Sequence, residues 1–248
     1  MIGYAFLHGG GQGSWVWQET VEALHRQTDD AFGRAFVLDV PGCGQKRERA
    51  TGDLSLDDVA RELVSDIESA GMKKVVLVGH SQGGQAMVFM LRHRPELFRR
   101  AVYISCSIPL PGQNGLEMIG KGRHGSSDRE VGWPFDPDVV TDMNERYSLM
   151  FCNDMTAEQN AAFLGKLGKD MWPMRSYTET NWSCDHLGAV PASFVVCMQD
   201  AILTVPWQEK FADRVKAERR IHIDAGHQVM TTRPHALAEV LRHEADLI

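Results

Sequence analysis

The sequence predicts an α/β protein with a mostly parallel β-sheet, helices on both faces of that sheet, and one helical insertion. Short apolar runs, typical of buried strands, alternate with helical patterns along most of the 248 residues. This alternation stops between about residues 108 and 186 and then resumes. One buried run, at residues 75–78, passes into a helical pattern through a tight glycine-rich turn. Repeated strand–helix–strand units imply right-handed crossovers, and therefore a parallel sheet.

Local signals place the individual elements. Ser55 can cap a helix over residues 55–71, and Gly71 can end it. Asp57 and Asp58 favour the positive N-terminus of that helix. The expected strands lie at residues 2–10, 35–44, 75–78, 99–107, 192–200 and 219–227. The expected helices lie at residues 17–27, 55–71, 85–95, 205–216 and 234–248.

The interruption over residues 108–186 predicts a helical insertion. Prolines and a stretch rich in glycine and charge break the strand rhythm there. Helical patterns follow at residues 138–151 and 156–167, without a convincing buried strand. We therefore expect residues 1–107 and 187–248 to form one α/β core, and the insertion to form a helical cap on it.

Composition and charge limit the classes of partner. With 43% hydrophobic and 24% charged residues, the chain has an ordinary globular composition that can bury a large core. Its formal net charge of −7, without a basic stripe, argues against nucleic acid or an anionic membrane as partner. The first residues carry neither a signal peptide nor an apolar membrane span, so we expect a cytoplasmic protein.

The cysteines predict neither a disulfide framework nor a metal site. There are five of them, scattered along the chain and never in a CxxC spacing. No other metal-ligand spacing stands out. We expect most of the cysteines to be small core residues or reduced thiols.

Residues 79–83, Gly-His-Ser-Gln-Gly, match the G-x-S-x-G pattern of a nucleophile elbow. In that motif the serine occupies a strained turn between a strand and a helix, which lifts its hydroxyl above the strand ends. Gly79 and Gly83 are needed because a larger side chain would collide where the strand and the helix pass closely. A merely tight turn is the alternative, but the buried strand and apolar helix on either side favour a nucleophilic Ser81.

A serine hydroxyl attacks only when a base takes its proton and an acid orients that base. The order along the chain is then serine, acid, histidine, with the acid and the histidine each following a strand. Asp200 and His227 fit that order after Ser81. Asp224 is the rival acid, but three residues before His227 it is expected to shape the turn. The rival histidines are expected to be structural or on the surface: His80, His222, His235 and His243.

Acyl transfer also needs backbone N–H donors for the tetrahedral oxyanion. One is expected from Gln82, directly after the serine, and the other from Gly10, in the glycine-rich loop after the first strand. The competing interpretation of that loop is a phosphate cradle, since a helix follows it. However, "GGGQG" provides neither a complete G-x-G-x-x-G fingerprint nor a Walker lysine, which argues against a nucleotide site.

Four segments carry a family resemblance: "HGGGQGSWVW", "GHSQGG", "CMQDAILTVPWQEKFA" and "DAGHQVM". Over nearly its whole length the chain resembles α/β-hydrolases, and more narrowly plant methylesterases, hydroxynitrile lyases and their bacterial esterase relatives. The resemblance implies an α/β-hydrolase fold with a helical cap, an ester substrate and no cofactor. It assigns the nucleophile, acid, base and two oxyanion donors to Ser81, Asp200, His227, Gly10 and Gln82. Some relatives take the acid from the strand after the elbow, where this chain has "YISCS" without a carboxylate.

Three classes of function follow. A serine hydrolase that cleaves a carboxylic ester or lactone through an acyl-enzyme is favoured. The alternatives are a lyase of the hydroxynitrile lyase type with the same triad, and a slow-turnover ligand receptor on the same fold. The similar lyases have a threonine and a lysine where this chain has Gly9 and Gln228, which argues against efficient cyanohydrin cleavage. A cap lysine, Lys166 or Lys169, could still supply a cation.

The expected cap is rich in aromatic residues and methionine, which favours an apolar or aromatic substrate. Most of these side chains are expected to pack the cap onto the core, and a few to line the pocket. The candidate substrate contacts are Gly9, Trp133, Phe151, Trp172 and Trp182. The expected partner is a small-molecule ester, and the chain is also compatible with a homodimer.

Overall fold

A computed structural model describes residues 2–27 and 34–248 of the chain. Within those residues, six strands form one fully parallel sheet in the order β2-β1-β3-β4-β5-β6. They are β1 (Gly3–Leu7), β2 (Ala35–Leu38), β3 (Val75–His80), β4 (Phe98–Ile104), β5 (Ala192–Cys197) and β6 (Arg219–Ile223). The predicted α/β fold class with a mostly parallel sheet is confirmed.

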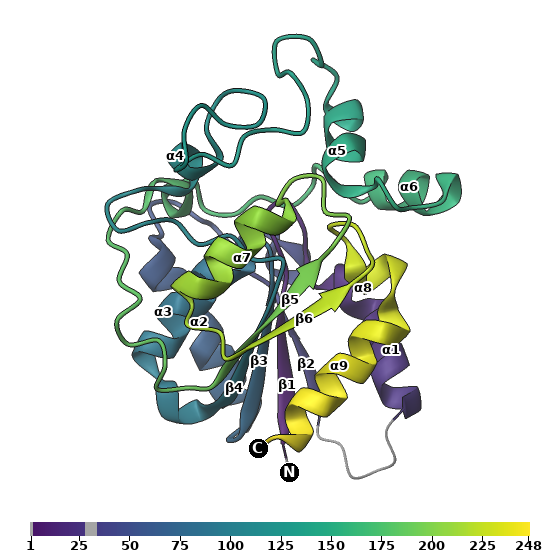
Figure 1. Cartoon of the computed structure of the whole chain (residues 1–248). Helices are drawn as coiled ribbons and strands as arrows, with labels where there is room; N and C mark the ends of the chain where they lie inside the picture. The colour runs from purple at the N-terminus through teal and green to yellow at the C-terminus, as the bar shows by residue number, and fades with distance from the viewer. Residues whose placement is uncertain (1, 28–33) are drawn as a thin grey trace.

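Helices cover both faces of the sheet (Figure 1). They are α1 (Gln18–Gln27), α2 (Leu56–Ser69), α3 (Gly83–His93), α4 (Gly115–Ile119), α5 (Met143–Phe151), α6 (Ala157–Leu164), α7 (Val205–Arg214), α8 (Val229–Thr232) and α9 (Pro234–Asp246). Short 3₁₀ helices are η1 (Ser14–Trp17), η2 (Gly44–Lys46), η3 (Pro95–Leu97) and η4 (Met174–Thr178). One face of the sheet packs against α1, α8 and α9, and the other against α2, α3 and α7.

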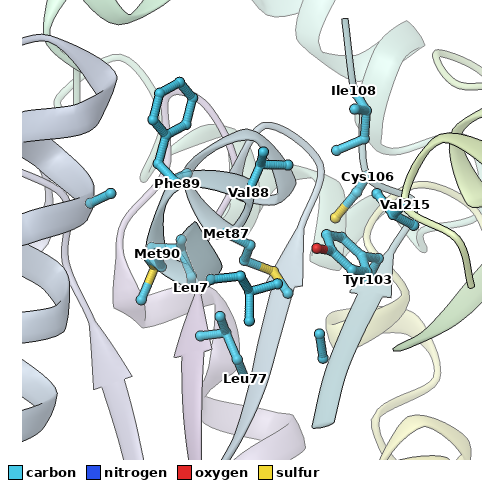
Figure 2. Close-up of a cluster of buried hydrophobic side chains, with 14 of the residues drawn as sticks. Leu7, Leu77, Met87, Val88, Phe89, Met90, Tyr103, Cys106, Ile108 and Val215 are labelled. Carbon is cyan, nitrogen blue, oxygen red and sulfur yellow. The ribbon is translucent and has the colours of Figure 1, made fainter. Parts of the chain in front are cut away.

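The sheet divides the core into two hydrophobic clusters, because alternate residues of a strand point to opposite faces. In β1, Tyr4 and Phe6 pack toward α1 and α9. Ala5 and Leu7 pack toward α2 and α3. Figure 2 shows this second cluster, in which Met87 of α3 lies against Leu7. Both faces are buried, which explains why the strands are continuous apolar runs in the sequence.

Two elements near the carboxyl edge of the sheet differ from the predicted ones. The second strand ends at Leu38. Two residues further on, the Val40 N–H donates to the His8 ring and not to a neighbouring strand. The helix α3 begins at Gly83, only two residues after Ser81, and not at residue 85. The chain therefore turns more sharply after the third strand than the apolar pattern alone predicts.

The predicted cap of α2 is present. The Ser55 hydroxyl oxygen accepts from the Asp58 N–H at 3.2 Å, and the Asp58 carboxylate accepts from the Ser55 N–H at 3.0 Å. Gly71 follows the helix with a φ of 75°, a left-handed conformation that suits glycine. The single-turn helix α8, which begins two residues after His227, was not predicted.

The chain between β4 and β5 lies beyond the carboxyl ends of the strands (Figure 1). It contains α4, α5, α6 and η4, and it adds no strand to the sheet that the described residues form. The division into a core of residues 1–107 and 187–248 and a cap of residues 108–186 stays a proposal. None of the described helices is long and apolar enough to span a membrane.

Candidate active site

Ser81 lies in the turn between β3 and α3, at the carboxyl edge of the sheet. Its φ is 52°, a left-handed conformation that is uncommon for a residue other than glycine. A Cβ on Gly83 would lie 2.8 Å from the His8 carbonyl oxygen, because α3 starts directly over the end of β1. A Cβ on Gly79 would collide with the Met87 side chain. The two glycines therefore permit the close packing that holds the serine in its strained turn.

His227 and Asp200 are hydrogen-bonded to each other. His227 Nδ1 lies 2.7 Å from Asp200 Oδ2, and both side chains are buried. Asp200 Oδ1 accepts from the N–H groups of Ile202 at 2.9 Å and Leu203 at 2.8 Å. Asp200 Oδ2 also accepts from the Ser105 hydroxyl. These donors fix the carboxylate in one orientation, directed at the imidazole.

The second ring nitrogen of His227, Nε2, is buried and has no hydrogen-bond partner among the described residues. His227 and Ser81 line the same pocket, which has a volume of about 600 Å³. Because Nδ1 is bound to the carboxylate, the proton of the neutral ring lies on Nδ1, and Nε2 is left as an acceptor. An acceptor of this kind can take the proton of a serine hydroxyl in the same pocket.

The rival residues have other environments. Asp224 is exposed and accepts from the Gln199 side chain at 2.6 Å. His80 is buried, and its Nε2 donates to the His227 backbone carbonyl at 2.9 Å, so it supports the loop that carries His227. The remaining rival histidines lie in β6 and α9: His222, His235 and His243.

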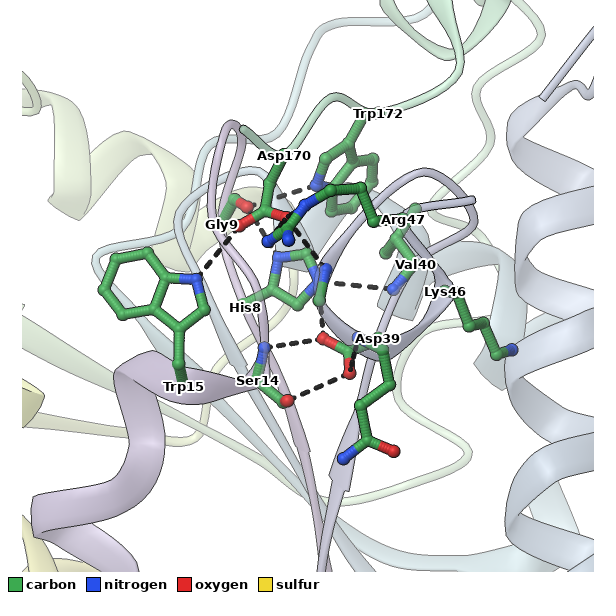
Figure 3. Close-up of polar contacts among 12 residues, drawn as sticks. His8, Gly9, Ser14, Trp15, Asp39, Val40, Lys46, Arg47, Asp170 and Trp172 are labelled. Carbon is green, nitrogen blue, oxygen red and sulfur yellow. Dashed lines mark hydrogen bonds and ion pairs between the residues drawn. The ribbon is translucent and has the colours of Figure 1, made fainter. Parts of the chain in front are cut away.

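Gly10 and Gln82 lie side by side at the pocket, since a Cβ on Gly10 would collide with the Gln82 side chain. The Gly9 carbonyl oxygen accepts from His8 Nδ1 at 2.8 Å and from Trp172 Nε1 at 3.1 Å (Figure 3). The C=O of Gly9 and the N–H of Gly10 belong to one trans peptide and point in opposite directions. Because the carbonyl is held by His8 and Trp172, the Gly10 N–H points away from these two side chains. Gln82 is the N-cap of α3, where backbone N–H groups lack helical partners. The arrangement can present two backbone donors to one oxygen atom.

A polar cluster beneath the glycine-rich loop escaped the sequence analysis (Figure 3). Asp39 accepts from the Ser14 N–H at 2.6 Å and from the Ser14 hydroxyl at 2.9 Å. His8 Nε2 accepts from the Val40 N–H at 3.2 Å, which places the ring proton on Nδ1, facing the Gly9 carbonyl. The loop between β1 and η1 is thus fixed by side chains at both of its ends.

Asp170, from the segment between β4 and β5, completes the cluster. Its carboxylate accepts from Trp15 Nε1 at 3.0 Å, from the Gly44 N–H at 2.9 Å and from the Arg47 guanidinium at 2.7 Å. These partners come from parts of the chain more than 120 residues away from Asp170. No local pattern of residues indicates a contact over such a separation.

Only some of the predicted substrate contacts line the pocket. Trp133 and Phe151 line it. Trp172 is 1% exposed and orients the Gly9 carbonyl, so it does not lie on the pocket wall. Trp182 packs against Phe89 of α3 at a ring-centroid distance of 5.4 Å. The structure therefore places Trp172 and Trp182 in the core, where their large apolar area is buried.

Three residues at and just beyond the end of α5 contact the loops that carry Asp200 and His227. The Phe151 ring stacks on the imidazole, with centroids 5.4 Å apart. Asn153 Nδ2 donates to the Gln199 carbonyl at 2.7 Å, and Asp154 Oδ2 accepts from the Gly226 N–H at 2.7 Å. Gln199 and Gly226 directly precede Asp200 and His227 in the chain. This segment therefore helps to hold both loops in place.

The cysteines match the prediction that they are core residues or reduced thiols. All five are free, and all but Cys184 are buried. Burial raises the pKa of the Cys106 thiol, which keeps it protonated. Among the described residues, no group of three or more histidine, cysteine, aspartate or glutamate side chains could hold a metal ion.

Two buried histidines make the stability of the fold depend on pH. Burial lowers the pKa of His80 well below its usual value, and the neighbouring His227 lowers it further. Burial also lowers the pKa of His8. In the unfolded chain both imidazoles titrate near their ordinary value of about 6.5. Below that pH the unfolded state binds more protons, so stability is complete above about pH 6.5 and falls as the pH drops.

We expect the free energy of unfolding to fall by about 1.4 kcal/mol per pH unit through His80, whose pKa is lowered well below its usual value, once the pH is well below 6.5. His8 should add to this fall in the same direction. Urea unfolding at about pH 7.5 and about pH 5.5 measures this dependence. The His80→Gln variant keeps an N–H donor for the His227 carbonyl but cannot be protonated, so its stability should depend less on pH. An equal pH dependence in the variant and the parent protein would contradict the prediction.

Comparison with known proteins identifies the family. Residues 5–240 match the model of the alpha/beta hydrolase family. The chain belongs to the alpha/beta hydrolase family. The match spans most of the chain, and it confirms the resemblance that the four quoted segments indicate.

Relatives of this alpha/beta hydrolase include plant proteins named as methylesterases and esterases. Putative methylesterase 11, chloroplastic, of Arabidopsis thaliana is 24% identical over 250 residues, covering 96% of this chain and 62% of that protein. Methylesterase 9 of Arabidopsis thaliana is 24% identical over 262 residues, covering 98% of each. Probable esterase PIR7A of Oryza sativa subsp. indica is 32% identical over 112 residues, covering 45% of this chain and 41% of that protein. The chain thus covers less than two thirds of the length of methylesterase 11 and of PIR7A.

Solved structures of other alpha/beta hydrolases share the fold. The methylesterase MES16 from Arabidopsis superimposes with a TM-score of 0.75 at 19% identity, covering 100% of both chains. A pyrethroid hydrolase from Sphingobium faniae JZ-2 gives a TM-score of 0.76 at 16% identity, covering 99% of this chain and 98% of that one. The likeness therefore covers both the sheet and the segment between β4 and β5.

Proposed function

We propose that this alpha/beta hydrolase is a serine hydrolase that cleaves carboxylic esters or lactones through an acyl-enzyme. The observation that carries the proposal is the buried pair of His227 and Asp200. The ring nitrogen Nε2 of His227 has no hydrogen-bond partner in the part of the chain that the structure describes, and His227 lines the pocket that Ser81 also lines. The names of the relatives, methylesterase and esterase, agree with the same chemistry.

In the first half of the proposed reaction, Ser81 Oγ attacks the ester carbonyl carbon while His227 Nε2 takes the hydroxyl proton. Asp200, hydrogen-bonded to Nδ1, stabilises the imidazolium that forms. The tetrahedral oxyanion accepts from the N–H groups of Gly10 and Gln82. When the carbon–oxygen bond of the ester breaks, His227 gives the proton to the departing alkoxide, and the acyl group stays on the serine.

In the second half, a water molecule gives a proton to His227 Nε2 and attacks the acyl-enzyme. The oxyanion forms again between the same two N–H groups. Its collapse releases the carboxylic acid, and the imidazolium returns its proton to Ser81 Oγ. Water supplies every atom that is added, so the proposed reaction needs no cofactor.

The pocket favours an apolar or aromatic ester. Its wall is made largely of hydrophobic side chains, among them Met118, Trp133, Met150, Phe151 and Leu203. Sites of this kind bind ligands through buried apolar area, while a few polar groups set the orientation. An aromatic ring is a good partner for Trp133 and Phe151 in particular.

The contacts around Gly9 and Gln228 argue against the lyase alternative. A Cβ on Gly9 would lie 3.0 Å from Ser81 Cβ and 3.1 Å from His80 Nδ1, so the threonine of the similar lyases does not fit there without movement. Gln228 is buried, and its neutral amide cannot replace an ammonium beside a departing cyanide. A hydrogen bond to a charged group is roughly twice as strong as a neutral one.

The lysines predicted as substitute cations lie elsewhere. Lys166 Nζ stacks over the Trp15 ring at 5.2 Å, and neither Lys166 nor Lys169 lines the pocket. Lys121 lines the pocket but is exposed. An exposed ammonium is hydrated and screened, so it stabilises a buried anion poorly.

We expect ester hydrolysis to be faster than cyanohydrin cleavage. The assay compares phenyl acetate and mandelonitrile side by side under identical conditions, with phenol release and cyanide release as the two signals. The ester route lacks none of its parts, whereas the lyase route lacks the hydroxyl and the cation described above.

Two results of this assay would contradict the proposal in different ways. Cyanide release faster than ester hydrolysis would favour the lyase. A single turnover of ester without further product would favour the receptor, which keeps the triad but turns over slowly.

A further inference from the structure

We propose that Gln85 and Ser107 form a polar subsite that binds a hydroxyl group on the acyl part of the substrate, close to the ester carbonyl. The inference rests on the proposed serine hydrolase function and narrows its substrate class to hydroxy esters with an apolar or aromatic remainder. Neither residue belongs to the proposed triad, and neither is among the site residues that the sequence predicts.

The pair lies next to the proposed nucleophile. Gln85 is in the first turn of α3, and Ser107 follows β4. The Ser107 N–H donates to the Ser81 carbonyl at 3.2 Å, and the Gln85 N–H donates to the Gln82 carbonyl at 2.9 Å. Both side chains line the pocket, and they are only 3% and 5% exposed. A substrate group that reaches them must therefore lie near the carbon that the serine attacks.

Gln85 and Ser107 are hydrogen-bonded to each other, but each side chain keeps a donor or an acceptor that this bond does not use. Gln85 Nε2 donates to Ser107 Oγ at 3.0 Å. This is the one side-chain hydrogen bond that either residue makes within the described part of the chain, so it uses neither the Ser107 hydroxyl proton nor the Gln85 carbonyl oxygen. With the amide turned round, the serine would donate, and an amide N–H and a serine lone pair would be unused instead. In either orientation the pair offers one donor and one acceptor, which is what a hydroxyl group needs.

The other polar groups of the pocket are already satisfied or reach water. The Asp170 carboxylate is occupied by Trp15, Gly44 and Arg47. The Tyr177 hydroxyl lies against the Gln82 side chain. Tyr147 is partly exposed and Lys121 is exposed.

The unused groups of Gln85 and Ser107 therefore lie among apolar walls. A purely apolar ester would cover this donor and acceptor without pairing them, which is costly. A site built to hydrogen-bond a hydroxyl group discriminates strongly against the analogue that lacks it.

Methyl mandelate and methyl phenylacetate test the subsite, because they differ only in the hydroxyl group beside the ester carbonyl. The two mandelate enantiomers react equally fast with hydroxide, so any difference between them arises from binding to the protein. We expect one enantiomer to be preferred over the other, and over methyl phenylacetate, by roughly tenfold or more in kcat/KM.

Two variants and one control assign the preference to the pair. Gln85→Leu and Ser107→Ala should each reduce the ratio between the two enantiomers toward one. Ser107→Ala removes a single oxygen atom and serves if the larger change at Gln85 impairs folding. Gln18→Leu makes the same chemical change on the exposed surface of α1 and should leave the ratio as in the parent protein.

The outcomes separate the subsite from the proposed function. Turnover of all three esters with equal kcat/KM for the enantiomers, unchanged in both variants, overturns the subsite and leaves the hydrolase standing. If no ester is cleaved, the hydrolase proposal fails, and calorimetry on the Ser81→Ala protein decides the subsite. Tighter binding of one mandelate enantiomer than of methyl phenylacetate supports it there, and equal affinities overturn it.

Discussion

Replacement of Ser81 by alanine, or of His227 by alanine, is expected to lower kcat/KM for ester hydrolysis by roughly 10⁴-fold or more. In the proposed mechanism the first change removes the attacking oxygen, and the second removes the buried Nε2 that takes its proton. Initial rates with phenyl acetate measure the loss. A fluorophosphonate probe, which labels activated serines, should label the parent protein and not the Ser81→Ala variant.

A matched control separates chemistry from folding. Ser65→Ala makes the same change on the exposed face of α2 and should leave both rate and labelling unchanged. Thermal unfolding shows whether each variant is folded. A folded Ser81→Ala protein with near-normal activity on its best ester would end the mechanism proposed here.

Asp200→Asn is expected to lower kcat by roughly 10⁴-fold, whereas Asp224→Asn should have little effect. An asparagine at 200 donates to Nδ1 through its amide, so the ring proton moves to Nε2 and the imidazole can no longer accept from the serine. It also leaves the imidazolium without a counter-charge. Asp224 is the matched control, because its carboxylate is exposed and binds the Gln199 side chain.

Rates of both variants at neutral pH decide between the two acids. Since each change replaces one oxygen by an amide nitrogen, a difference between them reflects position and not the chemistry of the substitution. If Asp224→Asn is the more damaged protein, the acid has been assigned to the wrong residue.

Much of the core could be predicted because its signals are local. Val75 to Val78 form a strand that is buried on both faces, and an apolar run of that kind is visible without any tertiary information. Ser55 and Asp58 cap α2 within one turn of chain. The pairing of Asp200 with His227 follows from the order of strands, since the carboxyl ends of parallel strands meet at one edge of the sheet.

The lining of the pocket could not be predicted, because aromatic residues in the insertion look alike in the sequence. Trp133 lines the pocket, whereas Trp172 and Trp182 are buried in the core. Which role each takes depends on tertiary contacts, such as the bond from Trp172 to the Gly9 carbonyl, which joins residues 163 positions apart. Composition therefore predicts that the site is apolar, but not which residues line it.

The polar partners of the site were missed for the same reason. In the sequence, "YISCS" indicates only that the strand after the elbow carries no carboxylate. The structure has Ser105 at that position, donating to the Asp200 carboxylate from 95 residues away. A short hydroxyl side chain gives no sign in the sequence that it will bind an acid from another strand.

The bonds of Asn153 and Asp154 to the loops of the acid and the histidine limit how this protein could be re-engineered. Chimaeras that exchange residues 108–186 for the equivalent segment of a relative would transplant a new pocket wall. They would also remove two side chains that hold the loops of Asp200 and His227 in place. A successful graft must therefore carry over these two side chains or stop short of residue 151. An exchange of this segment is therefore expected to change the turnover rate along with the range of substrates.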